Sequence, residues 1–298
     1  MLDALTWLFG NMFGGIMNLF RAIADPMSWL NWADPQALIR FIYYGGSTGF
    51  FFVVLDLFLI FLIIGLIRRQ VLWGVVRGIE FTHNVLGRFF AWAGLLMVLQ
   101  QVVIVFLQRI FRVSVISIGP FGDIFTRDLS WYAEELKLYN AMIVALCCAY
   151  TFVQGGHVRV DLVYAGVSRR TKNLIDMAGS LLFILPTMTL IWMFGWFFLW
   201  RHLVTPKVSA SDRLELLERK ARLLKWNVET IGFSPNGFDG YFLFKILLVA
   251  FAGTMFLQGV AFFYRNLLEY IEGDESAGKY HDKDDLGDDL ADKVAEIH

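Results

Sequence analysis

Charged residues are scarce in this sequence: they make up 18% of its 298 residues, whereas hydrophobic residues make up 57%. Ordinary soluble domains carry about 25% charged residues, so a soluble chain of this length would need more polar surface. The net charge of −1 excludes a basic nucleic-acid-binding domain. The two cysteines, Cys147 and Cys148, are adjacent in an apolar run, which excludes a disulfide scaffold. The remaining class is an integral membrane protein, which has the lipid bilayer as its surroundings and no nucleic-acid partner.

Apolar stretches long enough to cross a bilayer occur at five places. A hydrocarbon layer of ~30 Å needs about 20 mostly apolar residues in a helix that rises ~1.5 Å per residue. The five stretches are 45–67, 89–107, 138–156, 177–200 and 246–264. We therefore predict an all-α polytopic helical membrane protein with about five transmembrane helices plus interfacial amphipathic helices.

The N-terminal residues 1–44 predict two interfacial helices. The first covers about residues 4–20, and its glycines and asparagines leave a short sixth span as an alternative. The second follows Asp34, which is a candidate N-cap, with Pro35 at the first helical position. This second helix is expected to lead into the first span.

The distribution of basic residues predicts the orientation in the membrane. Eight of them fall in the two short loops 68–88 and 157–176, and twin arginines follow the first span. Weighting short loops and the first helix places these loops in the cytoplasm and the N-terminus outside. The C-terminal segment 271–298 would then be an acidic cytoplasmic tail, since residues 272–298 contain ten acidic residues and three lysines.

The outer loop 201–241 is the one long segment between spans. Asp212 and Glu215 resemble a helix-start box, and the pairs Glu215–Arg219 and Glu218–Arg222 have i,i+4 spacing. An apolar stripe recurs at helical spacing in Leu214, Leu217, Ala221 and Leu224. We predict a short amphipathic helix over 212–226, which either lies on the lipid headgroups or serves as a docking surface for a partner.

Side chains that could carry chemistry are few. The five histidines, His83, His157, His202, His281 and His298, are expected in loops, at span ends or in the tail, which excludes haem held between facing spans. No motif of a metalloprotease, P-loop or nucleophile elbow accompanies them. We predict that the chain is not an enzyme and holds no metal and no cofactor.

Polar residues inside the predicted spans have two interpretations. Asp56 is the only acid within a span, and such a carboxylate is a candidate for ion or proton handling. It can equally be protonated, or can hold neighbouring helices together. Gln100 and Gln101 in the second span are expected to form hydrogen bonds between helices.

Charged residues frame the third span at both ends. Arg109 closes the second span, and Trp131, Glu134 and Glu135 lie at the opening of the third. An ion pair of Arg109 with Glu134 or Glu135 would tie these two spans together. After the span, the residues His157, Arg159 and Asp161 form a mixed-charge turn, in which Asp161 either caps the next helix or pairs with Arg159.

These residues resemble the small membrane subunit of the tripartite ATP-independent periplasmic (TRAP) transporters. The resemblance lies in an arginine that closes one span, W-x-x-E-E at the start of the next, and G-H-V-R-V-D after it. It covers residues 86–270 as a four-helix domain with an enlarged outer loop. Two further N-terminal segments resemble a longer variety of this subunit. They are the segment 45–85, expected as an extra helix and a cytoplasmic loop, and the helices of 1–44.

The resemblance implies a scaffold without chemistry of its own. Small subunits of this family pair with a large membrane subunit that holds the substrate and sodium sites, and a periplasmic binding protein delivers the substrate. It implies sodium-coupled uptake of organic acids in a multi-pass protein of the bacterial inner membrane. Arg109, Trp131, Glu134, Glu135, His157, Arg159 and Asp161 are then structural or subunit-interface residues. The alternative is a membrane anchor subunit of a redox enzyme complex.

Overall fold

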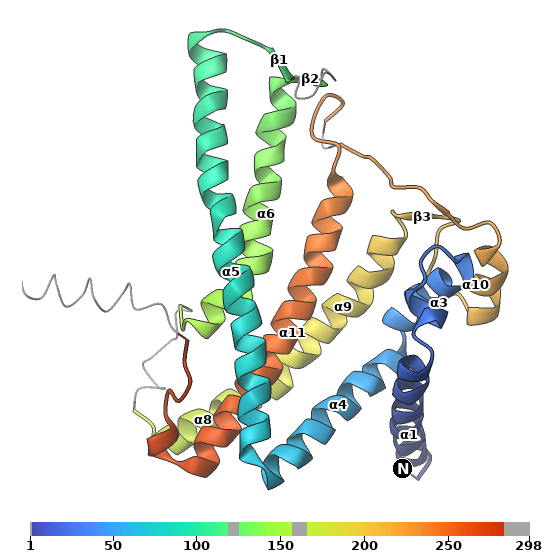
Figure 1. Ribbon diagram of the computed structural model, residues 1–298, viewed down its shortest axis with the longest axis vertical. Helices are drawn as coiled ribbons and strands as arrows, with labels where there is room; N and C mark the ends of the chain where they lie inside the picture. Colours follow the sequence, from blue (N-terminus) through green and yellow to red (C-terminus); the bar gives the residue numbers. More distant parts are fainter. Residues whose placement is uncertain (1, 119–124, 157–165, 233, 283–298) are drawn as a thin grey trace, which may run out of the picture.

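A computed structural model describes residues 2–118, 125–156, 166–232 and 234–282 of the chain. In these ranges, long helices are joined by short connections and two small antiparallel hairpins (Figure 1). Five helical segments are long and apolar enough to cross a membrane: α4 (Thr48–Ile67), α5 (Arg69–Val105, continued to Ile110), α6 (Leu129–Val153), α8 (Arg169–Gly179) joined to α9 (Leu185–Trp200), and α11 (Tyr241–Glu272). The predicted fold class and the five spans are therefore confirmed.

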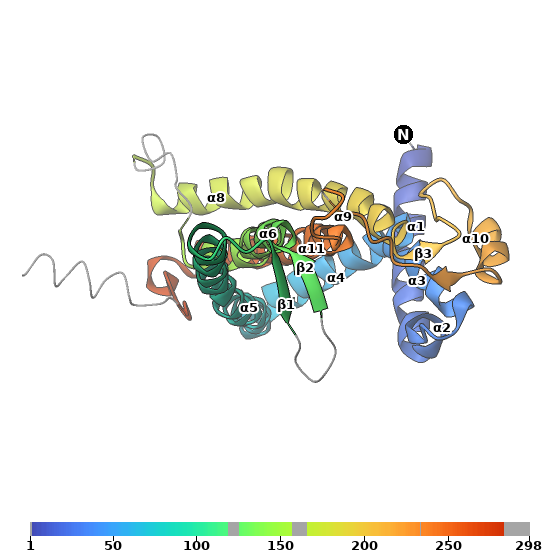
Figure 2. The same ribbon diagram turned by 90° about the horizontal axis from the view of Figure 1, so that it is seen from above.

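Helix α11 is central to the packing. It contacts α5, α6, α8 and α9, so most of the other spans meet on it. Seen from above, the long helices form a narrow row, and α1 (Leu2–Ala24) crosses this row at one end (Figure 2). In this arrangement each span has few neighbours within the chain, and much of its surface faces outward.

Helix α5 begins much earlier than the apolar run 89–107 indicates, so the expected loop 68–88 is wrong. Its buried residues recur at helical spacing from the start: Leu72, Trp73, Val76, Glu80, His83, Asn84 and Gly87. A helix needs one repeating buried face, and the arginines of this segment lie outside that face. Helix α8 likewise begins at Arg169, inside the expected loop 157–176, and Ser168 caps it by accepting a hydrogen bond from the Thr171 N–H.

The N-terminal segment contains α1, the single turn α2 (Met27–Leu30) and α3 (Pro35–Gly45). The predicted start of the second helix is confirmed, since the Asp34 side chain accepts a hydrogen bond from the Gln36 N–H at 3.1 Å. Helix α1 is longer than the expected 4–20, and it is not among the five spans. The interfacial position of these helices stays a prediction.

The helix of the outer loop, α10, is shorter than predicted and extends over Leu214–Ala221. Asp212 does not cap it, because its carboxylate accepts a hydrogen bond from the Ser209 N–H and pairs with Lys220 at 2.7 Å. The chain then turns into strand β4 (Lys225–Trp226), which pairs with β3 (Val204–Thr205). The expected end near Trp226 is therefore wrong.

The surface pairs predicted on this helix are also wrong, whereas its apolar stripe is confirmed. In the described part of the chain, neither Glu215–Arg219 nor Glu218–Arg222 forms an ion pair, and Glu218 instead lies 3.8 Å from Arg40 of α3. Leu217 and Ala221 are fully buried in a cluster that includes Leu38 and Ile42 of α3. The amphipathic helix therefore packs on the N-terminal segment of the same chain.

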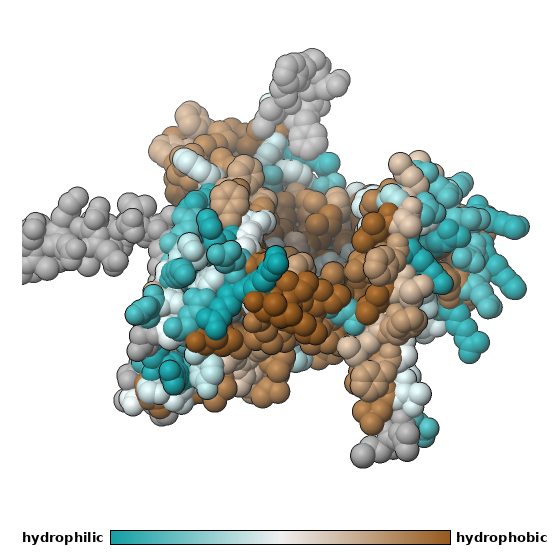
Figure 3. Space-filling model, turned by 60° about the horizontal axis from the view of Figure 1, so that its bottom comes forward, coloured by the Kyte–Doolittle hydropathy of each residue, from teal (hydrophilic) through white to brown (hydrophobic). Residues whose placement is uncertain are grey.

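Apolar side chains dominate much of the outer surface. Figure 3 shows them across the middle of one face, with polar side chains toward both edges. Among the exposed residues of the spans, Phe194 of α9 is 78% exposed and Phe89 of α5 is 68% exposed. Exposure of such a surface to water would be unfavourable for a monomer, whereas lipid chains cover it without a loss of free energy.

Gly87 lets α5 and α6 approach closely, because a Cβ atom at this position would overlap the Tyr150 side chain next to its backbone. We predict that Gly87→Ala lowers the stability by about 1–3 kcal/mol through overpacking, measured by thermal unfolding in detergent. Gly78→Ala on the same helix is the matched control, since a Cβ there meets nothing within 4 Å. The control should be neutral or stabilising, and an equal loss in both variants would contradict the close-approach argument.

Candidate functional site

The start of α6 meets two other segments at one end of the bundle, the outer end in the predicted orientation. One is the hairpin of β1 (Val115–Ile118) and β2 (Phe125–Asp128), and the other is the loop that leads into α11. We call this meeting point the outer junction, formed by Arg127, Trp131 and Glu134 on one side and residues 237–239 on the other. It contains Trp131 and Glu134 of the W-x-x-E-E pattern, and Arg127 lies just before this pattern in the chain.

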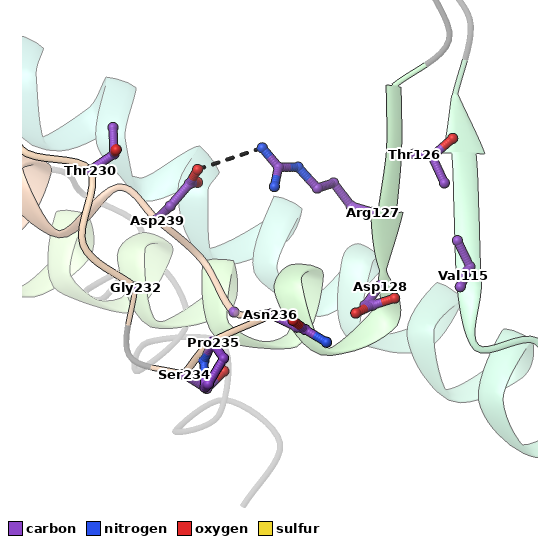
Figure 4. A pocket seen from close by; sticks show the side chains of 11 residues that line it. Val115, Thr126, Arg127, Asp128, Thr230, Gly232, Ser234, Pro235, Asn236 and Asp239 are labelled. Atoms are coloured by element: carbon purple, nitrogen blue, oxygen red, sulfur yellow. Dashed lines mark ion pairs between the residues drawn. The ribbon is translucent and has the colours of Figure 1, made fainter.

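Asp239 is the shared partner on the loop side of the outer junction. The Trp131 indole N–H donates a hydrogen bond to Asp239 Oδ1 at 3.1 Å. Arg127 Nη2 lies 3.5 Å from Asp239 Oδ2, and Figure 4 shows this pair. The Arg127 guanidinium also lies 5.6 Å from the centre of the Trp131 ring, within cation–π range. One carboxylate therefore links the hairpin, the first turn of α6 and the loop before α11.

Glu134 and Glu135 contact opposite neighbours of α6. Glu134 Oε2 accepts a hydrogen bond from the Phe238 backbone N–H at 3.0 Å, which ties α6 to the α11 loop. Glu135 Oε2 accepts one from Gln100 Nε2 at 3.1 Å, and Gln100 also donates to the Tyr132 carbonyl of α6. Since adjacent side chains on a helix point about 100° apart, two neighbouring acids connect α6 to both flanking spans. The predicted hydrogen bonding between helices is confirmed for Gln100, whereas Gln101 is exposed and forms no hydrogen bond with the described residues.

A polar pocket of about 310 Å³ lies in the outer junction. Figure 4 shows Thr126, Arg127 and Asp128 on the hairpin side and Asn236 and Asp239 on the loop side. The pair of Arg127 and Asp239 crosses the pocket, so the cation and the acid neutralise each other there. The pocket is thus lined by hydrogen-bonding groups, with Asp128 as one acid beyond the neutralised pair.

The predicted ion pair of Arg109 is wrong. Within the described ranges, Arg109 forms no ion pair with Glu134 or Glu135, and it is exposed in the last turn of the α5 helical segment. The contact of Gln100 with Glu135 sets the register between the helices. Arg109 lies nine residues further along, or about 13 Å at 1.5 Å per residue, which is beyond the reach of either acid.

His157, Arg159 and Asp161 lie outside the described residues, so the contacts predicted for them stay predictions. The segments on either side are described: α6 ends at Val153, and Gly155 adopts a left-handed backbone conformation with φ of 73°. Gln154 donates hydrogen bonds to the Asn84 side chain and to the Asp282 carbonyl. The motif therefore follows a helix end that is anchored to α5.

Asp56 is buried in α4 against α1, with 3% of its surface exposed. Its Oδ2 atom has no hydrogen-bond partner among the described residues. A Cβ atom on Gly15 of α1 would overlap this oxygen, so the glycine makes room for the carboxyl group. The two helices thus pack closely at the one acid that was predicted inside a span.

A buried ion pair at the other end of the bundle was missed by the analysis of the sequence. Arg265 of α11 donates hydrogen bonds from Nε and Nη2 to the two carboxylate oxygens of Glu80 of α5, and both side chains are 5% exposed. The Trp73 ring lies 5.3 Å from the guanidinium, and the Lys279 carbonyl accepts a further hydrogen bond from Nη1. We call Trp73, Glu80, Arg265 and Lys279 the inner cluster.

His83 lies next to this cluster inside α5, so its expected place in a loop is wrong. It is 2% exposed, and its Nδ1 lies 2.8 Å from Gln258 Oε1 of α11. The signal in the sequence was spacing: Glu80, His83 and Asn84 continue the stripe of Leu72, Trp73 and Val76. Polar residues that continue an apolar stripe at helical spacing indicate buried hydrogen bonds between helices.

The beginning of the predicted acidic tail contacts α5 and α11, and several of its residues, Asp282 among them, stay exposed. Residues 273–282 fold against α5, where Asn84 Nδ2 donates to both the carbonyl and the carboxylate of Asp282, and Arg88 lies 3.2 Å from that carboxylate. The Trp73 indole N–H donates to Glu272 Oε1 at 3.2 Å. Residues 283–298, which carry most of the acidic charge, lie outside the described part of the chain.

In the described ranges, His, Cys, Asp and Glu residues form no group of three or more that could hold a metal ion. The polar side chains of the outer junction and the inner cluster instead contact one another or the backbone. These contacts hold the helices together at defined points.

A row of apolar helices, with polar contacts between them at both ends, defines a polytopic helical membrane protein. Residues 116–214 match the family described as tripartite ATP-independent periplasmic transporters, DctQ component. The match covers about a third of the chain, from the outer hairpin to the first residue of α10. It confirms the resemblance to the small membrane subunit of TRAP transporters. No curated protein and no solved structure matches the chain.

The contact of Glu134 with residues 237–238 can be tested by a double-mutant cycle. Glu134→Ala leaves the Phe238 N–H without its partner, and Gly237→Ala places a methyl group where the Glu134 carboxylate lies. We expect each variant to lose about 1–3 kcal/mol in thermal unfolding, and the double variant to lose less than the sum by about 0.5 kcal/mol or more. Glu134→Ala combined with Gly179→Ala, at a site with open space, should be additive. Additivity in both cycles would contradict a direct contact.

The inner cluster predicts that one substitution in its ion pair lowers the stability more than substitution of both residues. Arg265→Met should cost about 3–5 kcal/mol, because it leaves the buried Glu80 carboxylate unpaired, whereas Glu80→Met with Arg265→Met should cost less. The matched control is Arg40→Met, since Arg40 and Glu218 form an exposed pair with 40% and 44% of their side chains accessible. Thermal unfolding in detergent should show about 1 kcal/mol or less for the control. A double variant less stable than Arg265→Met would refute this account.

Proposed function

We propose that this chain is the small scaffold subunit of a sodium-coupled TRAP transporter that takes up organic acids. It pairs with a large membrane subunit and works with a periplasmic substrate-binding protein, in the inner membrane of a bacterium. The observation that carries the proposal is the match to the DctQ component over residues 116–214. This range includes Trp131 and Glu134 of the outer junction, and Glu135 beside it.

The contacts of these side chains support a bracing role. Trp131 and Glu134 bind the loop before α11, and Glu135 binds Gln100 of α5, so three spans are held at their outer ends. The inner cluster holds α5 and α11 at the opposite end. A frame tied at both ends resists bending while a neighbouring protein moves against it.

The outer loop supports a contact with one of the partners. Helix α10 buries one face on α3, whereas Leu216 and Leu223 on other sides of this loop are 46% and 72% exposed. These two leucines are accessible to a partner protein. We assign this surface to the large subunit or the binding protein.

Reconstitution tests the proposal. The tagged chain should co-purify with a larger membrane protein identified by mass spectrometry, and liposomes with both proteins should accumulate an organic acid only with a sodium gradient and the binding protein. Liposomes that contain this chain alone should accumulate none, because it supplies no substrate site. Uptake by the chain alone would overturn the scaffold role. A haem Soret band in the purified protein would favour the redox-anchor alternative.

A further inference from the structure

Helix α4 is joined to α9 and α11 at two places, one at its start and one at its middle. At its start, the Trp192 indole N–H of α9 donates a hydrogen bond to the Gly45 carbonyl at 2.8 Å. At its middle, the Tyr264 hydroxyl of α11 donates to the Phe58 carbonyl at 2.6 Å, and the two rings stack with their centres 5.2 Å apart. Phe58 follows Ser47, the N-cap of α4, by eleven residues, or about 16 Å along the helix. These two contacts therefore fix the ends of a segment of α4.

An apolar groove of about 220 Å³ lies beside this segment, and we call it the α4 groove. Its walls come from the chain segments 45–54, 188–193 and 252–257, which belong to the start of α4, to α9 and to α11. Phe51 and Leu257 of the lining are 39% and 48% exposed, so the groove opens onto the outer surface of the row. Phe256 lies near the middle of the apolar run 246–264, which places the groove in the hydrocarbon layer.

The polar side chains that line the α4 groove are all bonded within the chain. The Ser47 hydroxyl donates to the Tyr44 carbonyl at 2.9 Å, and the Thr189 hydroxyl donates to the Leu185 carbonyl at 2.7 Å. The Trp192 indole is bonded as described above. The groove therefore offers an occupant only apolar contacts, and water does not occupy such a space. If the groove were empty, its walls would lose dispersion contacts.

The size of the α4 groove favours a hydrocarbon chain over a helix of another protein. One turn of a helix, ~10 Å wide and ~5.4 Å long, occupies about 400 Å³. That is nearly twice the volume of the groove. An acyl chain is a single row of methylene groups, and the bilayer supplies such chains at this depth. Met188 and Met193 in the lining have flexible side chains that adapt to the shape of an occupant.

We propose that the α4 groove binds one acyl chain of a membrane phospholipid, which fills the space between α4 and the pair of α9 and α11. The lipid is then a structural component that attaches the first span to the rest of the row. This inference does not depend on the identity of the partner subunits, so it can fail while the proposed function stands.

Mass spectrometry of the intact chain, purified in mild detergent, tests the occupant. The wild type should retain one phospholipid per chain. Val54→Phe places a ring in the α4 groove and should lower the retained phospholipid about tenfold, which corresponds to about two methylene groups excluded from the groove. Ile63→Phe is the matched control, since Ile63 is 59% exposed on the same helix and lies outside the lining, and it should retain the lipid. Equal retention in the two variants, or no retained lipid in the wild type, would overturn the proposal.

Photolabelling locates the lipid on the wild-type chain, so it does not depend on whether a variant folds. The chain is reconstituted with a phospholipid that carries a diazirine in its acyl chain, and weakly held lipid is removed with detergent before irradiation. The label should lie on Val54, Met188 or Met193 and be absent from Phe194, which is 78% exposed on α9. Equal labelling of Phe194 and the groove would contradict a specific site. A label that is missing from the chain purified together with its membrane partner would also overturn the proposal, because a protein side chain would then be the occupant.

Discussion

A polar side chain on a membrane-spanning helix has no water to bind, so it must meet another helix or another protein. This constraint explains where the spans of this chain are joined. Glu80 meets Arg265 at the inner end, and Glu134 and Glu135 meet the α11 loop and α5 at the outer end. The chain therefore satisfies these polar groups where its own helices touch.

The narrow row of helices makes these polar contacts more important than they would be in a globular core. Each span has few neighbours, and apolar packing against lipid gives no preference for one helix partner over another. Two tryptophans of α9 also join α3 to the row by hydrogen bonds. The Trp196 indole N–H donates to the Ile42 carbonyl, and the Trp192 indole N–H donates to the Gly45 carbonyl. Hydrogen bonds of this kind define which helices are neighbours as well as how strongly they bind.

The five spans, the amphipathic stripe of α10 and the Asp34 cap could be predicted because each depends on residues close together in the chain. The partners of Glu134 and Glu135 could not, since the Phe238 N–H and Gln100 are distant in sequence. The predicted pair with Arg109 failed because charge alone does not give the register between two helices. The helical segment 69–88 was missed for another reason: its charges interrupt the apolar run without interrupting the buried face of the helix.

Composition and hydrophobic run length by themselves determined that this is a helical membrane protein, because the thickness of the bilayer imposes the length of each apolar span. The local motif around Trp131 and Glu135 also determined the family resemblance. Only the tertiary structure decided which polar side chains meet, such as Arg265 with Glu80 and His83 with Gln258. The physical reason is that helix register and rotation depend on the packing of all neighbours at once, and no single segment of sequence contains that information.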